Sequence, residues 1–277
     1  MYKRISQTGV ALIAVLWVVA FLTTIASTVA HQSRTSLQMT KNRIEQLKLK
    51  QAAESAILMT IATKINFPGQ HVAYHTYKEI DDINITIAVH DESGKVDLNT
   101  APVEILRSLM VEIGVNEDVS LQIANVILDW RDQDNFVREN GAEDQEYISA
   151  GYQYESKDAD FERVEELQLI YGMTQDMYLA MLPYVTVHTY DYGVNLSVAS
   201  EMVRRAVENS SSLLANTSDS EEILDEDLDE FTSLTEGYIY TFAATAKNNN
   251  GMQQQISAII RIDRGNIYEP FTVLSWQ

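Results

Sequence analysis

The 21 residues from Val10 to Ala30 contain no charged side chain. A helix needs about 20 apolar residues to cross the hydrocarbon core of a bilayer, whereas the apolar region of a secretory signal peptide usually has about 7–15. Lys3 and Arg4 precede the stretch, and positive charge marks the flank that stays in the cytoplasm. We therefore expect a single membrane-spanning helix with a cytoplasmic N-terminus and the bulk of the chain on the other side.

A cleaved secretory signal is the alternative, because the small residues STVA directly precede His31. The sequence that follows favours an anchor. Residues 31–62 contain neither Pro nor Gly and are dominated by good helix formers, and the helix breakers Pro68 and Gly69 come later. Two sets of positions seven residues apart form a broken apolar stripe: Leu37, Ile44, Gln51 and Leu58, and Thr40, Leu47, Glu54 and Ile61. One unbroken helix over residues 10–62 is thus predicted.

Alternation of apolar and polar residues predicts strands on both sides of a different region. Residues 83–99 place an apolar residue at every second position from Ile83 to Val89, which is typical of a strand with one buried face. The pattern recurs near the C-terminus, where an Asn-rich tip ending in Gly251 indicates a hairpin. The expected C-terminal strands cover residues 238–247, 252–263 and 270–276. With the long helix, these segments predict an α+β fold with a small antiparallel sheet.

The region between these strands has a helical composition. Thr100 is in position to cap a helix that has Pro102 in its first turn and ends at Gly114. Three further segments have the apolar spacing of helices, so we expect a helical block over residues 97–188, inserted into the sheet domain. The four expected helices cover residues 100–114, 116–132, 163–173 and 175–185.

A short basic leader followed by a spanning helix with an amphipathic extension resembles type IV pilins and type II secretion pseudopilins. Leaders of that family end in Gly, and prepilin peptidase cuts after it, which implies cleavage between Gly9 and Val10. The family usually carries Glu at the fifth mature position, where it pairs with the terminal amine of a neighbouring subunit. This chain has Ala14 there, and the loss of that Glu is characteristic of the K-type minor pseudopilin.

The chain is similar to K-type pseudopilins over most of its length. The stretches that carry the resemblance are ILDWRDQDN (127–135), NGAEDQEY (140–147), VEELQLIYGMTQDMYLAMLPYVTV (164–187) and the terminal ISAIIRIDRGN and VLSW segments. The resemblance implies a leader at 1–9, a pilin-like sheet domain made of 63–96 and 236–277, and an inserted all-α domain at 97–188 that is SAM-like or helix-hairpin-helix-like. Residues 189–235 would then form a short second helical subdomain and an acidic linker.

Charge argues against nucleic acid as a partner, although the helical block is similar to helix-hairpin-helix DNA-binding modules. The formal net charge of the chain is −20, and residues 129–166 hold thirteen acidic residues against four basic ones. Such a surface repels phosphates, and of the Gly-rich hairpin that would hold them only Gly114 is present. We therefore expect no nucleic-acid partner.

One loop of the helical block is crowded with carboxylates, which repel one another unless they are hydrated or neutralised by a cation. The crowded acids are Asp129, Asp132, Asp134, Glu139, Glu143, Asp144 and Glu146. Ca²⁺ takes about six to eight oxygen ligands, but Phe136 and a missing Gly exclude an EF-hand. The pseudopilin resemblance implies calcium in the helical domain, and the expected ligands are Asp132, Asp134, Glu143 and Asp144. The alternative is a solvated acidic loop, partly balanced by Arg131 and Arg138.

The sequence has no feature of an enzyme. There is no Cys, and no catalytic triad order, phosphate loop or dinucleotide fingerprint appears, so a membrane-tethered hydrolase has no support. The resemblance instead implies a minor pseudopilin in the inner membrane, with its bulk in the periplasm. Its expected role is to cap the tip of the pseudopilus with I-, J- and H-type minor subunits, next to the major pseudopilin, and to support protein export across the outer membrane.

Two other functions remain as alternatives. A minor pilin of a type IV pilus fits the leader but not the helical insertion. A secreted calcium-dependent binding protein fits the acidic loop and requires an ordinary signal peptide. The mature N-terminus separates them, because processing by prepilin peptidase leaves Val10 first and signal cleavage leaves His31 first.

Overall fold

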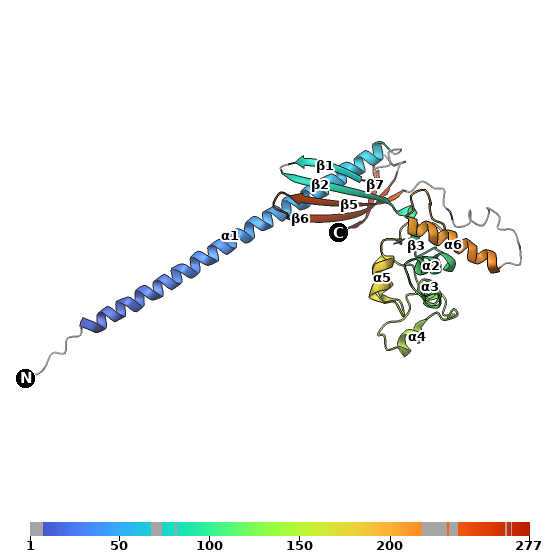
Figure 1. Cartoon of the computed structure of the whole chain (residues 1–277), viewed down its shortest axis with the longest axis horizontal. Coiled ribbons are helices and arrows are strands. Elements are labelled where there is room, and N and C mark those ends of the chain that lie inside the picture. Colours follow the sequence, from blue (N-terminus) through green and yellow to red (C-terminus); the bar gives the residue numbers. More distant parts are fainter. Residues whose placement is uncertain are drawn as a thin grey trace, which may run out of the picture. The chain divides into compact units, whose positions relative to one another are not determined.

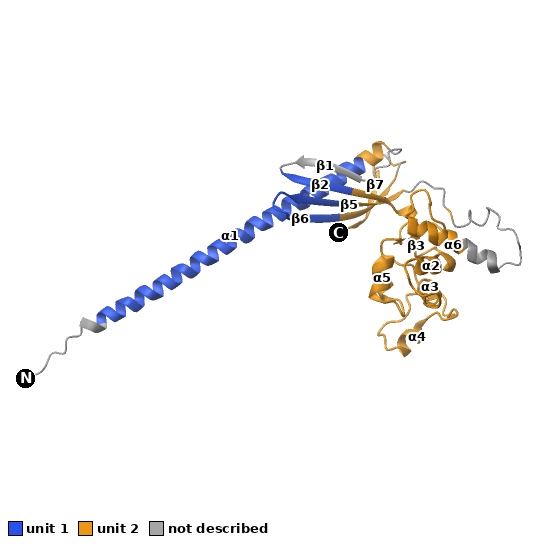
Figure 2. Ribbon diagram, viewed as in Figure 1, with its two compact units in different colours: residues 1–62, 75–87, 244–256 blue, residues 63–74, 88–243, 257–277 orange. Residues whose placement is uncertain are grey.

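The computed structural model describes residues 8–67, 74–80, 82–217, 232, 238–263, 265–266 and 268–277. Residues 1–7 of the expected leader and residues 218–231 of the expected acidic linker lie outside the described residues. The chain divides into two compact units, each built from segments far apart in the sequence (Figure 2). Unit 1 comprises residues 1–62, 75–87 and 244–256, and unit 2 comprises residues 63–74, 88–243 and 257–277.

Helix α1, Thr8–Asn66, runs without interruption (Figure 1). Its 59 residues contain no Pro, so the backbone hydrogen-bond ladder is unbroken and a rise of 1.5 Å per residue gives a length of about 90 Å. Residues 11–44 are exposed on every face, whereas Leu49, Ala53 and Ile57 are buried within unit 1. Among the described residues, α1 is the one helix long and apolar enough to cross a membrane. The predicted continuous helix is confirmed.

The larger sheet has five strands in the order β1-β2-β5-β6-β7. Strand β2 buries Ile83, Ile85 and Ile87 on one face and exposes the residues between them, as the alternation predicted. β6 and β7 are antiparallel, with Ile262 opposite Phe271. The strand bounds are β1 Tyr74–Ile80, β2 Ile83–Asp91, β5 Ile239–Asn248, β6 Gln253–Ile262 and β7 Phe271–Trp276. β2 and β5 are neighbours, so residues 92–238 form an insertion between two adjacent strands.

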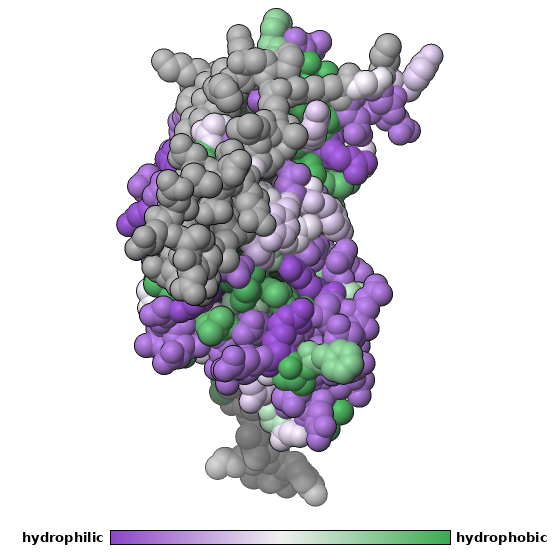
Figure 3. All heavy atoms as spheres, turned by 90° about the vertical axis from the view of Figure 1, so that its right-hand side faces the viewer, coloured by the Kyte–Doolittle hydropathy of each residue, from purple (hydrophilic) through white to green (hydrophobic). Residues whose placement is uncertain are grey.

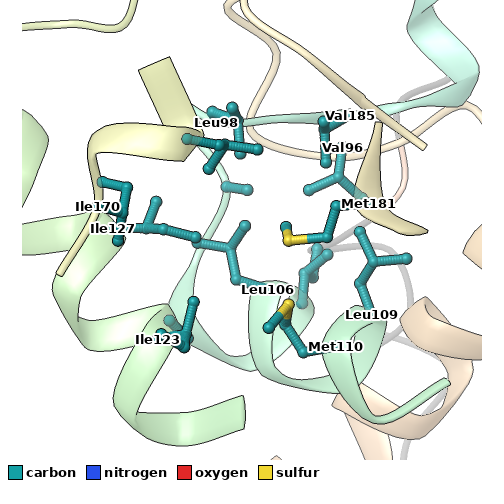
Figure 4. Packing of buried hydrophobic residues seen from close by; sticks show 14 of the residues in the cluster. Val96, Leu98, Leu106, Leu109, Met110, Ile123, Ile127, Ile170, Met181 and Val185 are labelled. Atoms are coloured by element: carbon teal, nitrogen blue, oxygen red, sulfur yellow. The ribbon is translucent and has the colours of Figure 1, made fainter. Parts of the chain in front are cut away.

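The inserted residues fold around one apolar core. Leu106 of α2 lies in the middle of this cluster, with Ile123 and Ile127 of α3 on one side and Leu109 of α2 and Met181 of α5 on the other (Figure 4). Complete burial of a side chain of this size contributes about 1.5–3 kcal/mol, so this core is the main source of stability in the insertion. The helices are α2 Val103–Glu112, α3 Glu117–Arg131, α4 Asp144–Ser149, the 3-10 turn η2 Val164–Leu169, α5 Gln175–Met181 and α6 Glu201–Thr217.

A short parallel sheet joins the two ends of the helical block. β3 (Val96–Asp97) pairs with β4 (Val185–Thr186), so the chain leaves the core next to the place where it entered. Asp97 is buried in this joint and accepts hydrogen bonds from the backbone N–H groups of Thr189 and Tyr190, both 2.9 Å away. Helix α6 follows and buries Val203, Ala206 and Val207 in the same core.

Two local predictions differ from the structure, and two elements were not predicted. Thr100 does not cap α2, because its hydroxyl donates to the carbonyl oxygen of Asp191 (2.5 Å) and Pro102 takes the cap position. The helix expected at 163–173 is the shorter 3-10 turn η2, because Ile170 after it is extended. Helix α4 lies in the acidic loop and was not predicted, and neither was strand β1.

Candidate metal site

Helix α3 fixes the first acidic residues of the loop. The side chain of Asn116 caps the helix by accepting from the backbone N–H of Asp118 (3.0 Å). At the other end, Trp130 is buried, with ring centroids 5.7 Å from Tyr147 and 6.4 Å from Phe161. This packing holds the last turn of α3 in place and thereby positions the neighbouring carboxylate of Asp129, which is also buried.

Arg138 already neutralises part of this charge. Its Nη1 lies 2.6 Å from Oδ1 of Asp129 and also donates to Oδ2 of Asp132. Its backbone N–H donates to Oδ2 of Asp129 (3.2 Å). Burial raises the pKa of Asp129, and these hydrogen bonds act in the opposite direction. Asp129 and Asp132 are therefore held by a cation that the chain itself supplies.

Glu143 is a buried carboxylate that forms no ion pair with any described residue of the chain. Only 2% of it is exposed, and it stands at the start of α4, where its N–H donates to Oε2 of Glu146 (3.0 Å). Its Oε2 accepts from the hydroxyl of Ser156 (2.9 Å), while its Oε1 is buried without a hydrogen-bond partner among the described residues. Burial raises the pKa of Glu143 to about 7; the Ser156 hydrogen bond acts in the opposite direction, and the charges of Asp129 and Asp132 add to the rise.

The hydroxyl of Ser156 gathers three carboxylates. Its Oγ lies 2.9 Å from Oε2 of Glu143, 2.8 Å from Oδ1 of Asp144 and 3.0 Å from Oδ1 of Asp158. A hydroxyl has one proton and can donate to one of these oxygens only. The two carboxylate oxygens that receive no proton then face the lone pairs of the Ser156 hydroxyl at hydrogen-bond distance, and these oxygens repel one another. A cation or a proton among the carboxylates would remove this repulsion.

Two groups of carboxylates in the described chain have the spacing of a metal site. Asp129, Asp132 and Glu143 form one group, and Glu143, Asp144 and Asp158 form the other, with ligand oxygens within 4.8 Å of one another. Ca²⁺ binds oxygen at about 2.3–2.6 Å, so two of its ligands lie at most about 5 Å apart. The second group fits a cation better, because Arg138 occupies the first and Glu143 offers the second a free oxygen.

The structure divides three of the four metal ligands that the sequence suggested between these groups, and the second group contains two of them. Asp132 is in the first group, Asp144 is in the second, and Glu143 is in both. Asp134 is in neither, because its Oδ1 accepts from the backbone N–H of Phe136 (2.9 Å) and supports the loop. Sequence reasoning did not single out Asp158, which lies 14 residues beyond Asp144 and is brought back by the turn after α4.

The predicted processing residues lie at the start of α1. Gly9 and Val10 are in its first turns, and Ala14 is exposed on the helix surface. Among the coloured residues of the face in Figure 3, most are hydrophilic and the apolar ones form small groups, in keeping with the acidic composition.

Comparisons with known proteins agree with this architecture. The family model described as type II secretion system (T2SS), protein K, matches residues 83–189. The chain is 25% identical over 226 residues to type II secretion system protein K of Pectobacterium carotovorum subsp. carotovorum, which covers 72% of this chain and 68% of that protein. The protein of the same name from Pseudomonas aeruginosa is 26% identical over 233 residues, covering 74% and 69%.

A solved structure has the same fold. A chain in the crystal structure of the GspK-GspI-GspJ complex from the enterotoxigenic Escherichia coli type 2 secretion system aligns with a TM-score of 0.65 at 16% identity, over 87% of this chain and 98% of that chain. The predicted fold class is thus confirmed: α+β, with an all-α domain inserted into a pilin-like sheet domain. The sequence matches to protein K, together with this fold, support a minor pseudopilin of the type II secretion system. Among such proteins, the chain is similar to type II secretion system protein K, both in the matched domain and over about 70% of its length.

Proposed function

We propose that this chain caps the tip of the periplasmic pseudopilus and thereby supports protein export across the outer membrane. The observation that carries the proposal is the insertion of residues 92–238 between the neighbouring strands β2 and β5. Pseudopilins assemble by packing their N-terminal helices side by side. A subunit with an added domain of this size obstructs the stacking of a further subunit beyond it, so it belongs at an end of the fibre.

The N-terminal helix supports the same position. Its first 20 or so mature residues are exposed and apolar, and burying them against other helices is favourable by about 25 cal/mol per Å². Ala14 provides no carboxylate for the terminal amine of a neighbour. A subunit at the tip has no neighbour beyond it and does not need that charge pair.

Partners and topology follow from this position. In the solved complex GspK is combined with GspI and GspJ, which supports I- and J-type minor pseudopilins as the direct partners of this chain. The H-type subunit and the major pseudopilin would then follow along the fibre. Before assembly, α1 anchors the chain in the inner membrane with Lys3 and Arg4 in the cytoplasm, and prepilin peptidase cuts between Gly9 and Val10. The chain acts as a structural component and not as an enzyme.

Calcium is the cation that we propose for the second carboxylate group. Glu143, Asp144 and Asp158 offer oxygen ligands only, which suits a hard cation and disfavours zinc. A bound Ca²⁺ would provide the positively charged partner that the Glu143 carboxylate lacks among the described residues. These residues would hold the start of α4 against the turn at Ser156, and so stabilise the loop between them.

Co-purification tests the proposed position. The full-length chain, expressed with the I-, J- and H-type and major pseudopilins of its own secretion system, is extracted in mild detergent and isolated by an affinity tag. The proposal predicts a complex that contains the I- and J-type subunits in equal amounts with this chain. Recovery of the chain with the major pseudopilin in large excess would place it along the shaft and contradict the tip position.

A further inference from the structure

The part of α1 beyond the predicted span carries an exposed apolar row. On a helix, positions seven residues apart return to nearly the same face. Leu37, Ile44 and Leu58 lie at such positions with Gln51 between the last two, and Leu47 lies beside them. All of these side chains are exposed. We call Leu37, Ile44, Leu47 and Leu58 the seam.

The chain's own sheet domain does not use the seam. At 100° per residue, the buried positions of the same helix are centred on the side opposite to the seam, and the one nearest to the seam, Ile61, lies at the boundary next to Leu47. The buried positions are Leu49, Ala53, Ala56, Ile57, Thr60, Ile61 and Lys64. The helix therefore packs on its own domain with one face and leaves the apolar row on the other face free for a second helix.

Basic side chains border the seam along both edges. Arg34, Lys41 and Lys48 are seven residues apart and follow one edge, and Arg43 and Lys50 follow the other. In a two-helix seam these are the flanking positions, whose charges pair with the partner helix and decide which partner is accepted.

Among the described residues, these cations find little compensation in the chain itself. α1 has only two acidic residues beyond the span, and both are engaged: Glu54 lies 3.7 Å from Lys50, and Glu45 accepts from Nδ2 of Asn248 (2.6 Å). Within the described part of the chain, Arg34, Lys41 and Lys48 make no ion pair. These three cations beside the apolar seam are thus available to pair with acidic groups of another molecule.

Lipid headgroups cannot satisfy the whole row. The apolar stretch ends at Ala30, and a rise of 1.5 Å per residue places Lys48 about 27 Å beyond that point. The headgroup layer on one side of a bilayer is only about 5–8 Å thick. Arg34 can reach phosphates, but Lys41 and Lys48 lie beyond the headgroup layer, where acidic side chains of a partner protein can pair with them.

We propose that the seam receives a helix of a neighbouring minor pseudopilin whose own apolar stripe is bordered by Asp or Glu, and that it rejects a second copy of this chain. Two copies would bring their basic rows together, and like charges across a helix interface are destabilising. The proposal rests on the proposed function, because it names the chemistry of the partner at the tip. It also accounts for a subunit that joins a fibre once and does not polymerise with itself.

A pair of triple variants of the full-length chain tests the partner. Arg34→Gln, Lys41→Gln and Lys48→Gln together remove three charges beside the seam, and Gln38→Glu, Asn42→Glu and Gln46→Glu change the net charge equally on the opposite face. Removing three exposed ion pairs should lower the affinity for the I- and J-type subunits in detergent by about tenfold. We expect that loss in the first variant only. Equal effects, or none, would overturn the proposal.

A second experiment needs no other subunit, so it separates this inference from the proposed function. Full-length wild-type chains are labelled and mixed in detergent with a copy that carries Arg34→Glu, Lys41→Glu, Arg43→Glu and Lys48→Glu. Energy transfer should report mixed pairs about tenfold more readily than wild-type pairs, and high salt should abolish the difference. Wild-type pairing as strong as mixed pairing contradicts the proposal.

Lipid is the remaining outcome. If the Gln variant binds the other subunits normally, but the full chain in vesicles loses a preference for phosphatidylglycerol over neutral lipid, the basic row belongs to the membrane surface and the proposal fails.

Discussion

A Cβ atom on Gly141 would lie 1.9 Å from Oδ2 of Asp129. No real contact is so short, so the loop can approach the buried carboxylate only because residue 141 has no side chain. The backbone of the loop and the last turn of α3 are in this way fitted to one another, and Arg138 holds the same carboxylate from another side.

We therefore predict that Gly141→Ala destabilises the protein by about 1–3 kcal/mol, because either the loop or Asp129 must move. Thermal unfolding of the full-length chain in detergent measures the effect. Gly265→Ala is the matched control, because no atom lies within 4 Å of a Cβ at that position, and it should leave the melting temperature nearly unchanged. Equal stability of the two variants would show that the close approach does not exist.

Calcium should raise the melting temperature of the wild-type chain. At a free concentration of about one hundred times Kd, binding contributes about 2.7 kcal/mol, or a rise of roughly 5–10 °C for a domain of this size. Glu143→Gln and Asp158→Asn should lose most of this rise. Asp134→Asn should keep it, because Asp134 supports the loop and lies outside both carboxylate groups.

The stability of Glu143→Gln without calcium provides a second test of the metal site. Glu143→Gln keeps the shape of the side chain but removes a buried charge that has too few partners, so the metal-free variant should be at least as stable as the metal-free wild type. If Glu143 instead stabilised the fold without a metal, the metal-free variant would be less stable than the metal-free wild type. If the wild type shows no shift at millimolar calcium, the metal assignment is wrong.

Trp130 is the side chain that fixes the end of α3. Trp130→Ala should cost about 3–5 kcal/mol, because the ring is buried among Tyr147, Tyr154 and Phe161. Phe136→Ala is the control in the adjacent loop. Its ring is 83% exposed, so the change should stay within about 0.5 kcal/mol of the wild type in chemical denaturation.

Ala14→Glu should impair assembly at the tip. The substitution places a carboxylate in an apolar helix bundle where, in our account, no terminal amine of a further subunit lies beyond it. Secretion by cells that carry the variant should fall several-fold, and Ala14→Gln, which adds no charge, should have a smaller effect. Full activity of Ala14→Glu would mean that a partner amine is present and that the chain does not end the fibre.

The elements with a clear period could be predicted from the sequence. The uncharged stretch and the missing helix breakers define α1, and the alternation of Ile83, Ile85 and Ile87 defines β2. Helix α3 has both a cap, Asn116, and an apolar spacing. In each of these cases the local pattern and the tertiary structure require the same conformation.

The remaining features depend on contacts that no local pattern contains. Thr100 has the chemistry of a cap, but a carbonyl 91 residues away takes its hydroxyl. Asp158 joins the carboxylate group only because the chain folds back after α4, and Asp134 leaves it because a backbone N–H is nearer. A crowd of acids in sequence therefore indicates a cation site, whereas the fold decides which of them meet.

The mature N-terminus is the most direct test of the account. Intact mass spectrometry of the chain, isolated from membranes of cells with an active prepilin peptidase, should give a species that begins at Val10 and requires detergent for its extraction. A species that begins at His31 and is found in the soluble periplasmic fraction would show that the apolar segment is a discarded signal, and it would contradict the assignment to the pseudopilus.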